Sequence, residues 1–290
     1  MPYFNIVAET SENTVVTEYE PVKKRSDSYQ SEAALEQEFI RLLCEQGYEY
    51  LPIHREKDLT ANLRKKLEEL NNYQFSDTEW DDFFKNAVAN PNEHIVEKTR
   101  KIQEDNVQVL TRDDGSSKNI TLIDKKNIHN NRLQVINQYV IGTENGAKHD
   151  NRYDVTVLVN GLPLVHIELK RRGVAIREAF NQINRYQSDS FWAGCGLYEY
   201  IQIFVISNGT NTKYYSNSTR RNAEKEHEKR GASKTKTSNS FEFTCFWADA
   251  NNRVIPDLID FTKTFFAKHT ILNILAKYCV FTSENMLLVM

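Results

Sequence analysis

Three ionisable side chains interrupt an otherwise apolar stretch, residues 152–173, with the sequence RYDVTVLVNGLPLVHIELKRRG. Asp154 opens the first of two predicted strands, and Glu168 and Lys170 close the second. Such groups are costly to bury unless something compensates them. Two carboxylates beside an amine suit a hard divalent cation such as Mg²⁺, which takes oxygen ligands and can activate a water for attack on a phosphate. The stretch therefore predicts a metal-dependent site for phosphodiester chemistry.

The geometry of the turn decides whether these three groups can meet. Residues i and i+2 of a strand share a face, so Glu168 and Lys170 point the same way as His166. A strict two-residue Asn-Gly turn would place Asp154 on the opposite face. We therefore expect a three-residue loop at 159–161, or an equivalent bulge nearby, which sets Asp154 opposite His166 and diagonal to Glu168.

The helical pattern that follows, at 174–189, adds polar groups to this candidate site. Gln182 and Tyr186 are spaced i, i+4 and share one helix face. The opposite face is expected to pack into the core. Between strand and helix, three cations suit a phosphate backbone; they are Arg171, Arg172 and Arg177.

The sequence contains further groups that suit the same site. The first predicted helix offers Glu32 and Glu36 as a possible additional metal ligand. His166 is expected to be a hydrogen-bonded neighbour that shapes the pocket rather than a contact to phosphate.

Two alternatives use the same residue types without this chemistry. An isolated acid…ExK pattern also fits a structural hairpin in which Lys170 pairs with one of the acids. A second acid…DxK pattern occurs in RDDGSSKNITLIDKK, with Asp114, Asp124 and Lys126. We favour the first pattern, because the Asp-Gly of the second is typical of a turn and Lys126 is expected in a loop.

Composition limits the class of protein. A chain of 290 residues with 40% hydrophobic and 27% charged residues is typical of a globular protein, and its net charge of −3 excludes a uniformly basic nucleic-acid binder but not a local basic groove. The four cysteines form no CxxC, so we expect reduced thiols, with neither a disulfide framework nor a zinc site. No apolar run reaches the length of a membrane span. We expect a cytoplasmic protein without a membrane partner.

Periodicity along the chain predicts an α/β fold with a central mixed sheet flanked by helices. Residues 1–30 are expected to be short strands and polar loop. The predicted helices lie within 31–48, 56–70, 77–89, a segment ending near 104, 174–189 and 254–278. The predicted strands lie within 106–112, 119–124, 132–141, the hairpin, 200–209, 241–249 and 285–290.

Domain boundaries follow from composition. Residues 216–240 contain no large hydrophobe and are expected to form a mobile insertion. The apolar run at the C-terminus stops abruptly, which predicts that a further domain is missing. We expect a first domain at 1–255, with its core at about 106–215, and the start of a second at 256–290.

The motif around Asp154, Glu168 and Lys170, together with several other segments, resembles a known family. Residues 152–186 resemble the PD-(D/E)xK nuclease motif and the QxxxY element of the restriction (R) subunits of type I restriction-modification enzymes, in their type IC-like branch. The segments NPNEHIVEKTRKIQ, IDKKNIHNNRLQVINQ and IQIFVISNGT extend the likeness over nearly the whole chain. The resemblance implies a restriction-endonuclease-like core with N-terminal helical additions.

The resemblance also implies roles. Asp154 and Glu168 would bind Mg²⁺, with Glu32 as a further ligand, and Lys170 would be the catalytic lysine. Gln182 and Tyr186 would help position DNA and the site. Double-stranded DNA would be the substrate, and the modification (M) and specificity (S) subunits would be the partners. An ATP-driven motor would follow the nuclease; no GxxxxGK[ST] phosphate loop occurs in this chain.

Two other functions stay open at this point. The chain could be a non-catalytic docking module between motor and methylase core, with a structural acidic site. It could also be a stand-alone junction-resolving or repair nuclease.

Overall fold

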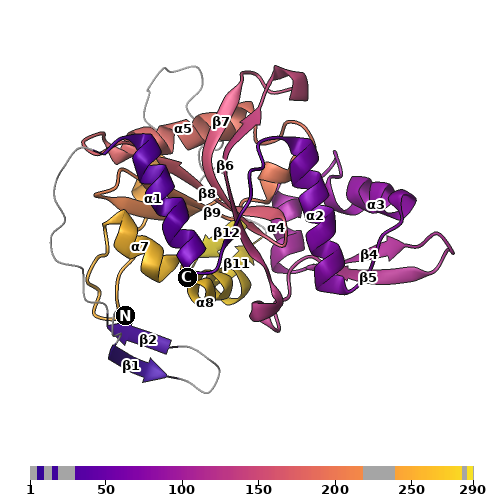
Figure 1. Ribbon diagram of the computed structural model, residues 1–290, viewed down its shortest axis with the longest axis horizontal. Coiled ribbons are helices and arrows are strands. Elements are labelled where there is room, and N and C mark those ends of the chain that lie inside the picture. Colours follow the sequence, from indigo (N-terminus) through magenta and orange to yellow (C-terminus); the bar gives the residue numbers. More distant parts are fainter. Residues whose placement is uncertain (1–4, 10–14, 19–29, 218–238, 283–285, 290) are drawn as a thin grey trace.

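A computed structural model describes residues 5–9, 15–18, 30–217, 239–282 and 286–289 (Figure 1). Its centre is a six-stranded sheet in the order β10-β9-β8-β7-β6-β3. The pairs β3/β6 and β8/β9 are parallel and the other neighbours are antiparallel. The predicted α/β fold with a mixed sheet is confirmed. The strands are β3 Glu49–Tyr50, β6 Leu133–Ile141, β7 Asn151–Val159, β8 Leu162–Leu169, β9 Ile203–Ser207 and β10 Thr212–Ser216.

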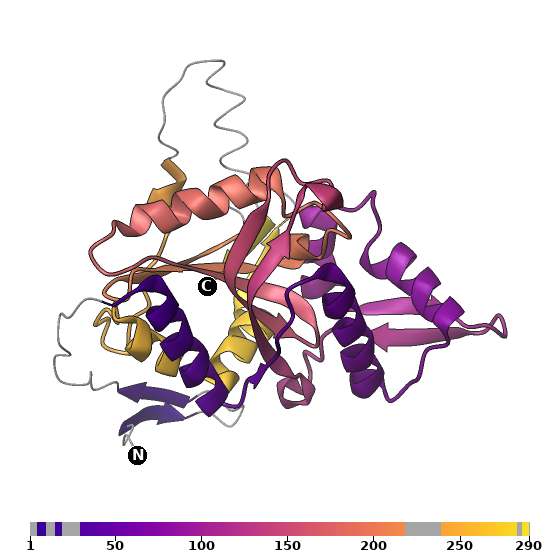
Figure 2. The same cartoon turned by 45° about the horizontal axis from the view of Figure 1, so that its top comes forward.

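The middle of the sheet is the core of the molecule. Every residue of β8, and every residue of β7 from Val155 onward, is buried, with Val157 and Val165 fully inaccessible. Helix α5 (Ile176–Asp189) crosses one face of the sheet, and α1 (Glu32–Glu45) lies with the C-terminal helices on the other (Figure 2). Strands covered on both faces read as continuous apolar runs, which is why polar groups stand out in this hairpin.

Helix α1 forms where its sequence signals predict. The hydroxyl of Ser31 accepts a hydrogen bond from the Ala34 N–H at 3.2 Å and so caps the first turn. Leu35 and Phe39 bury one face, and the helix ends before Gly47, whose φ of +88° suits glycine.

A second group of elements flanks the sheet. It contains α2 (Glu56–Asn71), α3 (Asp77–Phe83), α4 (Ile95–Gln103) and the two-stranded sheet of β4 (Val107–Thr111) and β5 (Ser117–Thr121). The β4–β5 hairpin extends away from the main sheet beside α2 and α3 (Figure 1). The predicted helices and strands of this region are confirmed, with α3 continuing as a π-helical turn at Phe84–Val88.

The C-terminal helices α7 (Leu258–Phe265) and α8 (Lys268–Asn273) join the same hydrophobic core as α1. The rings of Phe39 and Phe266 lie 5.4 Å apart, and the Tyr48 hydroxyl donates to the Phe266 carbonyl at 2.8 Å. The helical prediction for 254–278 is confirmed. That residues 256–290 begin a separate domain stays a prediction.

Short strands complete the described chain. β1 (Asn5–Glu9) pairs with β2 (Val15–Glu18), and β11 (Cys279–Thr282) pairs with β12 (Met286–Val289), where a strand was expected. The prediction of a mobile insertion at 216–240 falls mostly outside the described residues.

The strand predicted at 241–249 is wrong. The segment begins in a 3₁₀ turn, Asn239–Phe243, and only isolated bridges follow, one of them between Tyr214 and Cys245. Its alternating aromatic residues pack sideways against α5 and α7 rather than pairing along an extended strand, since Phe241 contacts Phe180 and Trp247 contacts Phe265.

No helix in the described part of the chain is both long and apolar enough to cross a bilayer. The four cysteines are free: Cys44 and Cys245 are exposed, Cys195 is half-buried and Cys279 is buried.

Candidate active site at the β7–β8 hairpin

The turn between β7 and β8 contains two residues, so the predicted three-residue loop is wrong. Val159 pairs with Leu162, and the turn residues Asn160 and Gly161 have φ angles of +51° and +85°. Positive φ at both positions is the hairpin turn that Asn-Gly favours. The alternative that we allowed, a bulge nearby, is what forms: the register shifts after Val157, and β8 carries one extra residue at this point.

The bulge changes which residues face one another. Thr156 pairs with His166 and Val155 with Ile167. Continuing this register by one residue places Asp154 opposite Glu168, not opposite His166 as expected. The extra residue restores the parity that a tight turn alone would have lost.

Asp154, Glu168 and Lys170 meet at the end of the hairpin. The Lys170 Nζ donates to Glu168 Oε1 at 2.9 Å, and the Leu169 N–H donates to Asp154 Oδ2 at 2.9 Å. The second oxygen of Glu168 is buried and has no hydrogen-bond partner. Glu168 is fully buried whereas the Lys170 side chain is 13% exposed and Asp154 is half-buried, so the site opens to solvent past Asp154 and Lys170.

The electrostatics of the pair reflect burial and like charge. Burial, together with the charge of Glu168, raises the pKa of Asp154 to about 7. Burial also raises the pKa of Glu168 to about 7, although Lys170 favours its ionised form. For Lys170, burial disfavours the charge, but the neighbouring carboxylates outweigh it and raise its pKa. A cation with more than one positive charge would relieve this repulsion.

His166 is sealed behind the carboxylates. It is inaccessible to solvent, its Nε2 lies 3.6 Å from Glu168 Oε2, and its Nδ1 lies 3.5 Å from the Thr156 hydroxyl. Burial lowers its pKa to about 4, so the ring is neutral at pH 7. Its place beside the ring of Tyr153 is that of a side chain that shapes the pocket.

Helix α1 brings two more carboxylates close by. Glu32 is exposed, and its Oε1 accepts from the Arg171 N–H at 3.3 Å. Within the described residues no group of three or more His, Cys, Asp or Glu side chains is close enough to share a metal. The structure therefore brings together Asp154 and Glu168 but does not place Glu32 with them as a third ligand.

Glu36, the second of these carboxylates, contacts strand β6 in a way that no local sequence pattern predicts. Its carboxylate accepts hydrogen bonds from the side chains of Asn137, at 2.6 Å, and Gln138. Gln138 has a φ of +52°, unusual for a residue in a strand, at the position of β6 that faces Asp154. Burial raises the pKa of Glu36, as does the charge of Asp154, while the two amides lower it. No local sequence pattern predicts a left-handed residue inside INQYV.

Gln182 and Tyr186 do lie together, as their spacing predicts. The Gln182 amide donates to the Tyr186 hydroxyl, which donates to the Arg152 carbonyl at 2.9 Å. Tyr186 is only 2% exposed and packs against Tyr153, so the expectation that it faces away from the core is wrong. The pair ties α5 to the strand two residues before Asp154.

Each of the three arginines makes a different contact. Arg171 is exposed, and its backbone N–H donates to Glu32. Arg172 packs against Gly209, where an added Cβ would lie 3.3 Å from its side chain. The guanidinium of Arg177 lies 4.9 Å from the ring centroid of Phe241.

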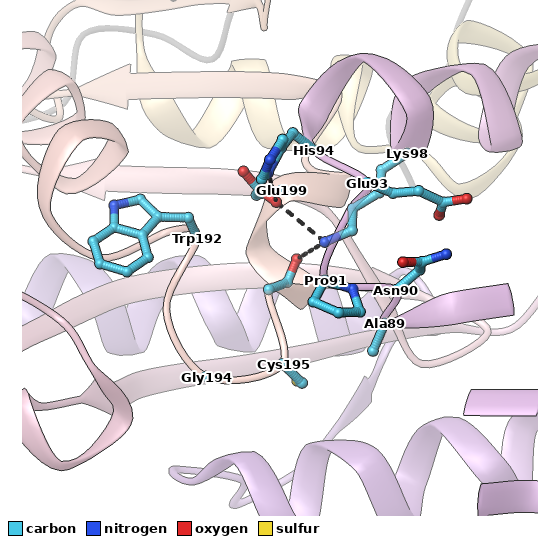
Figure 3. A pocket seen from close by; sticks show the side chains of 11 residues that line it. Ala89, Asn90, Pro91, Glu93, His94, Lys98, Trp192, Gly194, Cys195 and Glu199 are labelled. Carbon is cyan, nitrogen blue, oxygen red and sulfur yellow. Dashed lines mark hydrogen bonds and ion pairs between the residues drawn. The ribbon is translucent and has the colours of Figure 1, made fainter. Parts of the chain in front are cut away.

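A cavity of about 430 Å³ lies elsewhere in the molecule, between the loop before α4 and the loop after α5 (Figure 3). Inside it the Lys98 amine donates to the Gly196 carbonyl at 2.9 Å and to Glu199 at 3.1 Å, so this buried lysine is already paired. None of the residues predicted for the active site lines this cavity.

Comparison with known proteins gives one consistent family. Residues 29–223 match the family model described as type I restriction enzyme R protein N terminus. The chain is 49% identical over 285 residues to the type I restriction enzyme EcoprrI endonuclease subunit of Escherichia coli, covering 98% of this chain and 85% of that protein. It is 35% identical over 268 residues to the SsaAORF53P endonuclease subunit of Staphylococcus saprophyticus and 34% over 266 residues to the SauMSSORF170P subunit of Staphylococcus aureus.

The last two matches cover 90% of this chain but 26% of each relative, so the chain spans about a quarter of the staphylococcal proteins. The resemblance expected from the sequence is confirmed.

Proposed function

The chain belongs to the type I restriction enzyme R protein family, as its N-terminal endonuclease-subunit region, and from this premise we propose that it hydrolyses phosphodiester bonds of double-stranded DNA with Mg²⁺. One observation carries the proposal. Asp154 and Glu168 face each other across the hairpin, and the Lys170 amine lies 2.9 Å from Glu168 at the side that opens to solvent.

The residues fit a divalent cation. Both candidate ligands supply carboxylate oxygens, the donor type that Mg²⁺ prefers. The buried Glu168 Oε2 has no hydrogen-bond partner, an arrangement that is costly unless another group satisfies it. Mg²⁺ commonly binds through one or two carboxylates and keeps several waters, so the absence of a third protein ligand does not conflict with it.

Each side chain then has a role that follows from its position. A bound cation would polarise the scissile phosphate and lower the pKa of a water beside it. Asp154 and Glu168 hold their oxygens toward a common point, fixed by the Leu169 N–H and by Lys170. The Lys170 ammonium, partly exposed, can donate to the attacking water or to the phosphate oxygen on which charge develops.

The surrounding residues support substrate and site. Gln182 and Tyr186 fix the start of β7 and thereby the position of Asp154. Arg171 is exposed beside the site and can pair with a DNA phosphate, and Arg177 presents a second cation from the first turn of α5. We assign the mixed sheet with its carboxylate hairpin to the PD-(D/E)xK, restriction-endonuclease-like fold.

The family sets the wider context of the proposal. We propose that the chain works in the cytoplasm with modification and specificity subunits, which select the DNA. We propose also that its cleavage of DNA is coupled to ATP-driven DNA translocation. No base-reading helix is proposed for this chain.

Glu168→Gln is the sharpest test, because it removes one charge without changing the shape of a buried side chain. We expect Mn²⁺ binding to the 290-residue chain, measured by calorimetry, to be lost, and cleavage of plasmid DNA by the enzyme assembled with its partner subunits to fall by at least about 100-fold. ATP hydrolysis by the assembled enzyme should persist. Glu45→Gln, at the exposed end of α1, is the matched control and should change neither.

The ion pair between Lys170 and Glu168 also favours a second candidate, a non-catalytic docking module in which the pair is structural. That function predicts no metal binding and unchanged cleavage in Glu168→Gln. Retained cleavage would therefore reject the nuclease site and support docking.

A further inference from the structure

A group of aromatic rings and cations covers the edge of the sheet next to α5. We call it the cation–aromatic platform and define it by five residues: Arg177, Lys213, Phe241, Phe243 and Phe246. Phe243 is 59% exposed and Phe246 is 40% exposed. The Lys213 amine lies 4.9 Å from the ring centroid of Phe241 and 4.7 Å from that of Phe246, and the Arg177 guanidinium lies 4.9 Å from Phe241.

The platform is held in place by the edge strand β10. The Tyr214 N–H donates to the Cys245 carbonyl at 2.9 Å, and the Cys245 N–H donates to the Tyr214 carbonyl at 2.8 Å. The Lys213 amine donates to the Thr244 hydroxyl at 3.0 Å. Because backbone and side-chain bonds fix the segment, the exposed rings are displayed on a supported surface rather than on a free loop.

The platform adjoins the candidate active site through α5. Phe180 of this helix contacts Phe241 at 5.4 Å and Tyr215 at 5.2 Å, and the segment beginning at Asn239 lies over the first turns of α5 (Figure 2). The same helix carries Gln182 and Tyr186, which bond to the strand that holds Asp154. Helix α5 therefore contacts both the platform and the strand that carries Asp154.

We propose that the cation–aromatic platform binds a DNA strand whose bases are unpaired. Exposed rings stack on the faces of such bases, and interleaved cations neutralise the phosphates between them. A duplex keeps its base faces covered by stacking, so Phe243 and Phe246 cannot reach them there. The inference rests on the proposed function, since it takes DNA as the polymer, and adds a site for one separated strand beside the place of cleavage.

Charge favours this occupant over an apolar partner. A purely hydrophobic docking face would be depleted of charge at its centre. Here Lys213 lies between two rings at the centre of the patch, and Arg177 borders it. Glu178 and Glu242 are exposed and reduce the net positive charge of this surface. The phosphates would therefore bind to the cations beside the rings, Lys213 above all.

The test is fluorescence-anisotropy titration of the 290-residue chain with a dT oligonucleotide of about 16 nucleotides and with a blunt duplex of equal length, both in EDTA. We expect the chain to prefer the single strand. Phe243→Ala combined with Phe246→Ala should weaken dT binding by roughly 5- to 150-fold per stacked base. Lys213→Gln should reduce the dependence of binding on salt.

Matched controls come from the β4–β5 hairpin. Val109→Ala removes another exposed apolar side chain, and Lys118→Gln removes a cation that lies 5.0 Å from the ring of Tyr73. Neither should change dT binding. Circular dichroism checks that the phenylalanine variant is folded, which its exposed positions favour.

The outcomes separate this inference from the proposed function. If the phenylalanine variant binds dT like the unchanged chain, or if the chain prefers the duplex or binds neither, the platform is not a site for unpaired bases. If dT binding depends on the rings while Lys170→Ala leaves cleavage by the assembled enzyme intact, the platform stands and the nuclease assignment fails.

Discussion

Two hairpins of this chain contain the same type of motif, an acid followed later by an acid-x-lysine triplet, but they arrange its side chains differently. The β7–β8 hairpin brings Asp154 together with Glu168 and Lys170 inside the main sheet, whereas the β4–β5 hairpin forms a separate two-stranded sheet. In the second hairpin the acid…DxK pattern is dispersed: Asp114 lies in the turn, and Asp124 comes after the strand has ended.

The difference lies in what each carboxylate meets. Asp124 accepts from the Lys126 N–H at 3.0 Å and from the Asn127 N–H at 2.8 Å, so it closes a local turn while the lysine side chain is exposed. Hydrogen bonds from Ser116 lower the pKa of Asp114, whereas burial raises the pKa of Asp154. The two acids of such a pattern therefore come together only in the hairpin where the fold buries them against each other.

The largest expected difference between the two hairpins is the effect of a lysine substitution on the rate of DNA cleavage. Lys170→Met removes the amine beside Glu168 and should reduce DNA cleavage by the assembled enzyme by at least about 100-fold, because the transition-state charge loses a donor. Lys126→Met, at the corresponding position of the other pattern, should leave the rate unchanged. Plasmid nicking measured for both variants checks this. Equal losses of cleavage would contradict the assignment of catalysis to Lys170 rather than Lys126.

The next largest expected difference is the effect of an alanine substitution on the free energy of unfolding. Leu158→Ala in β7 leaves a cavity at a fully buried position and should lower the free energy of unfolding by about 2–5 kcal/mol. Val109→Ala in β4, where the side chain is 62% exposed, should change it by less than about 0.5 kcal/mol. Urea unfolding measures both. Similar values would show that the β4–β5 hairpin is covered in solution.

The pH dependence of stability should differ in sign. Asp154 and Glu168 have pKa values raised to about 7, so in EDTA their protonated forms stabilise the fold at low pH and this contribution is lost as the pH rises through 7. Each pKa unit corresponds to about 1.4 kcal/mol. Asp114, with a lowered pKa, acts in the opposite direction and is exposed.

Urea unfolding at about pH 5 and pH 8 tests this sign. Glu168→Gln should flatten the profile, Asp114→Asn should not, and Mg²⁺ should restore stability at the higher pH. A profile that rises toward pH 8 in EDTA would contradict the burial of the acid pair.

The turns should give the smallest contrast. Gly115 and Gly161 have φ angles of +80° and +85°, so alanine is strained at either position by about 1–2 kcal/mol. At Gly161 an added Cβ would also lie 2.6 Å from the Leu63 Cα, whereas nothing lies within 4 Å at Gly115. Thermal unfolding should therefore show a larger loss of stability for Gly161→Ala than for Gly115→Ala. Equal losses of stability would contradict the close approach of Leu63 to the turn.

Much of this could be predicted from local patterns. The cap at Ser31 and the apolar periodicity of α1 located that helix, and the alternation around 152–173 located the hairpin. The spacing of Gln182 and Tyr186 predicted their contact, because i, i+4 neighbours meet on any helix.

Other features depend on tertiary structure and have no local signal. The position of the bulge followed from the tight Asn160-Gly161 turn combined with the need to keep apolar residues inside. The left-handed Gln138 is stabilised by Glu36, which lies about a hundred residues earlier in the chain. The segment after Asn239 alternates like a strand, yet the neighbouring helices, rather than a β partner, receive its rings.

The extra residue in β8 links the length of this hairpin to its chemistry. Deleting one residue of β8 between Leu162 and Glu168 would remove the bulge and leave Asp154 opposite Glu168, whereas inserting one residue there would turn Glu168 toward the far side of the sheet unless a second bulge formed. Homologous hairpins should therefore either keep this length with its bulge or lack one residue of β8 together with the bulge.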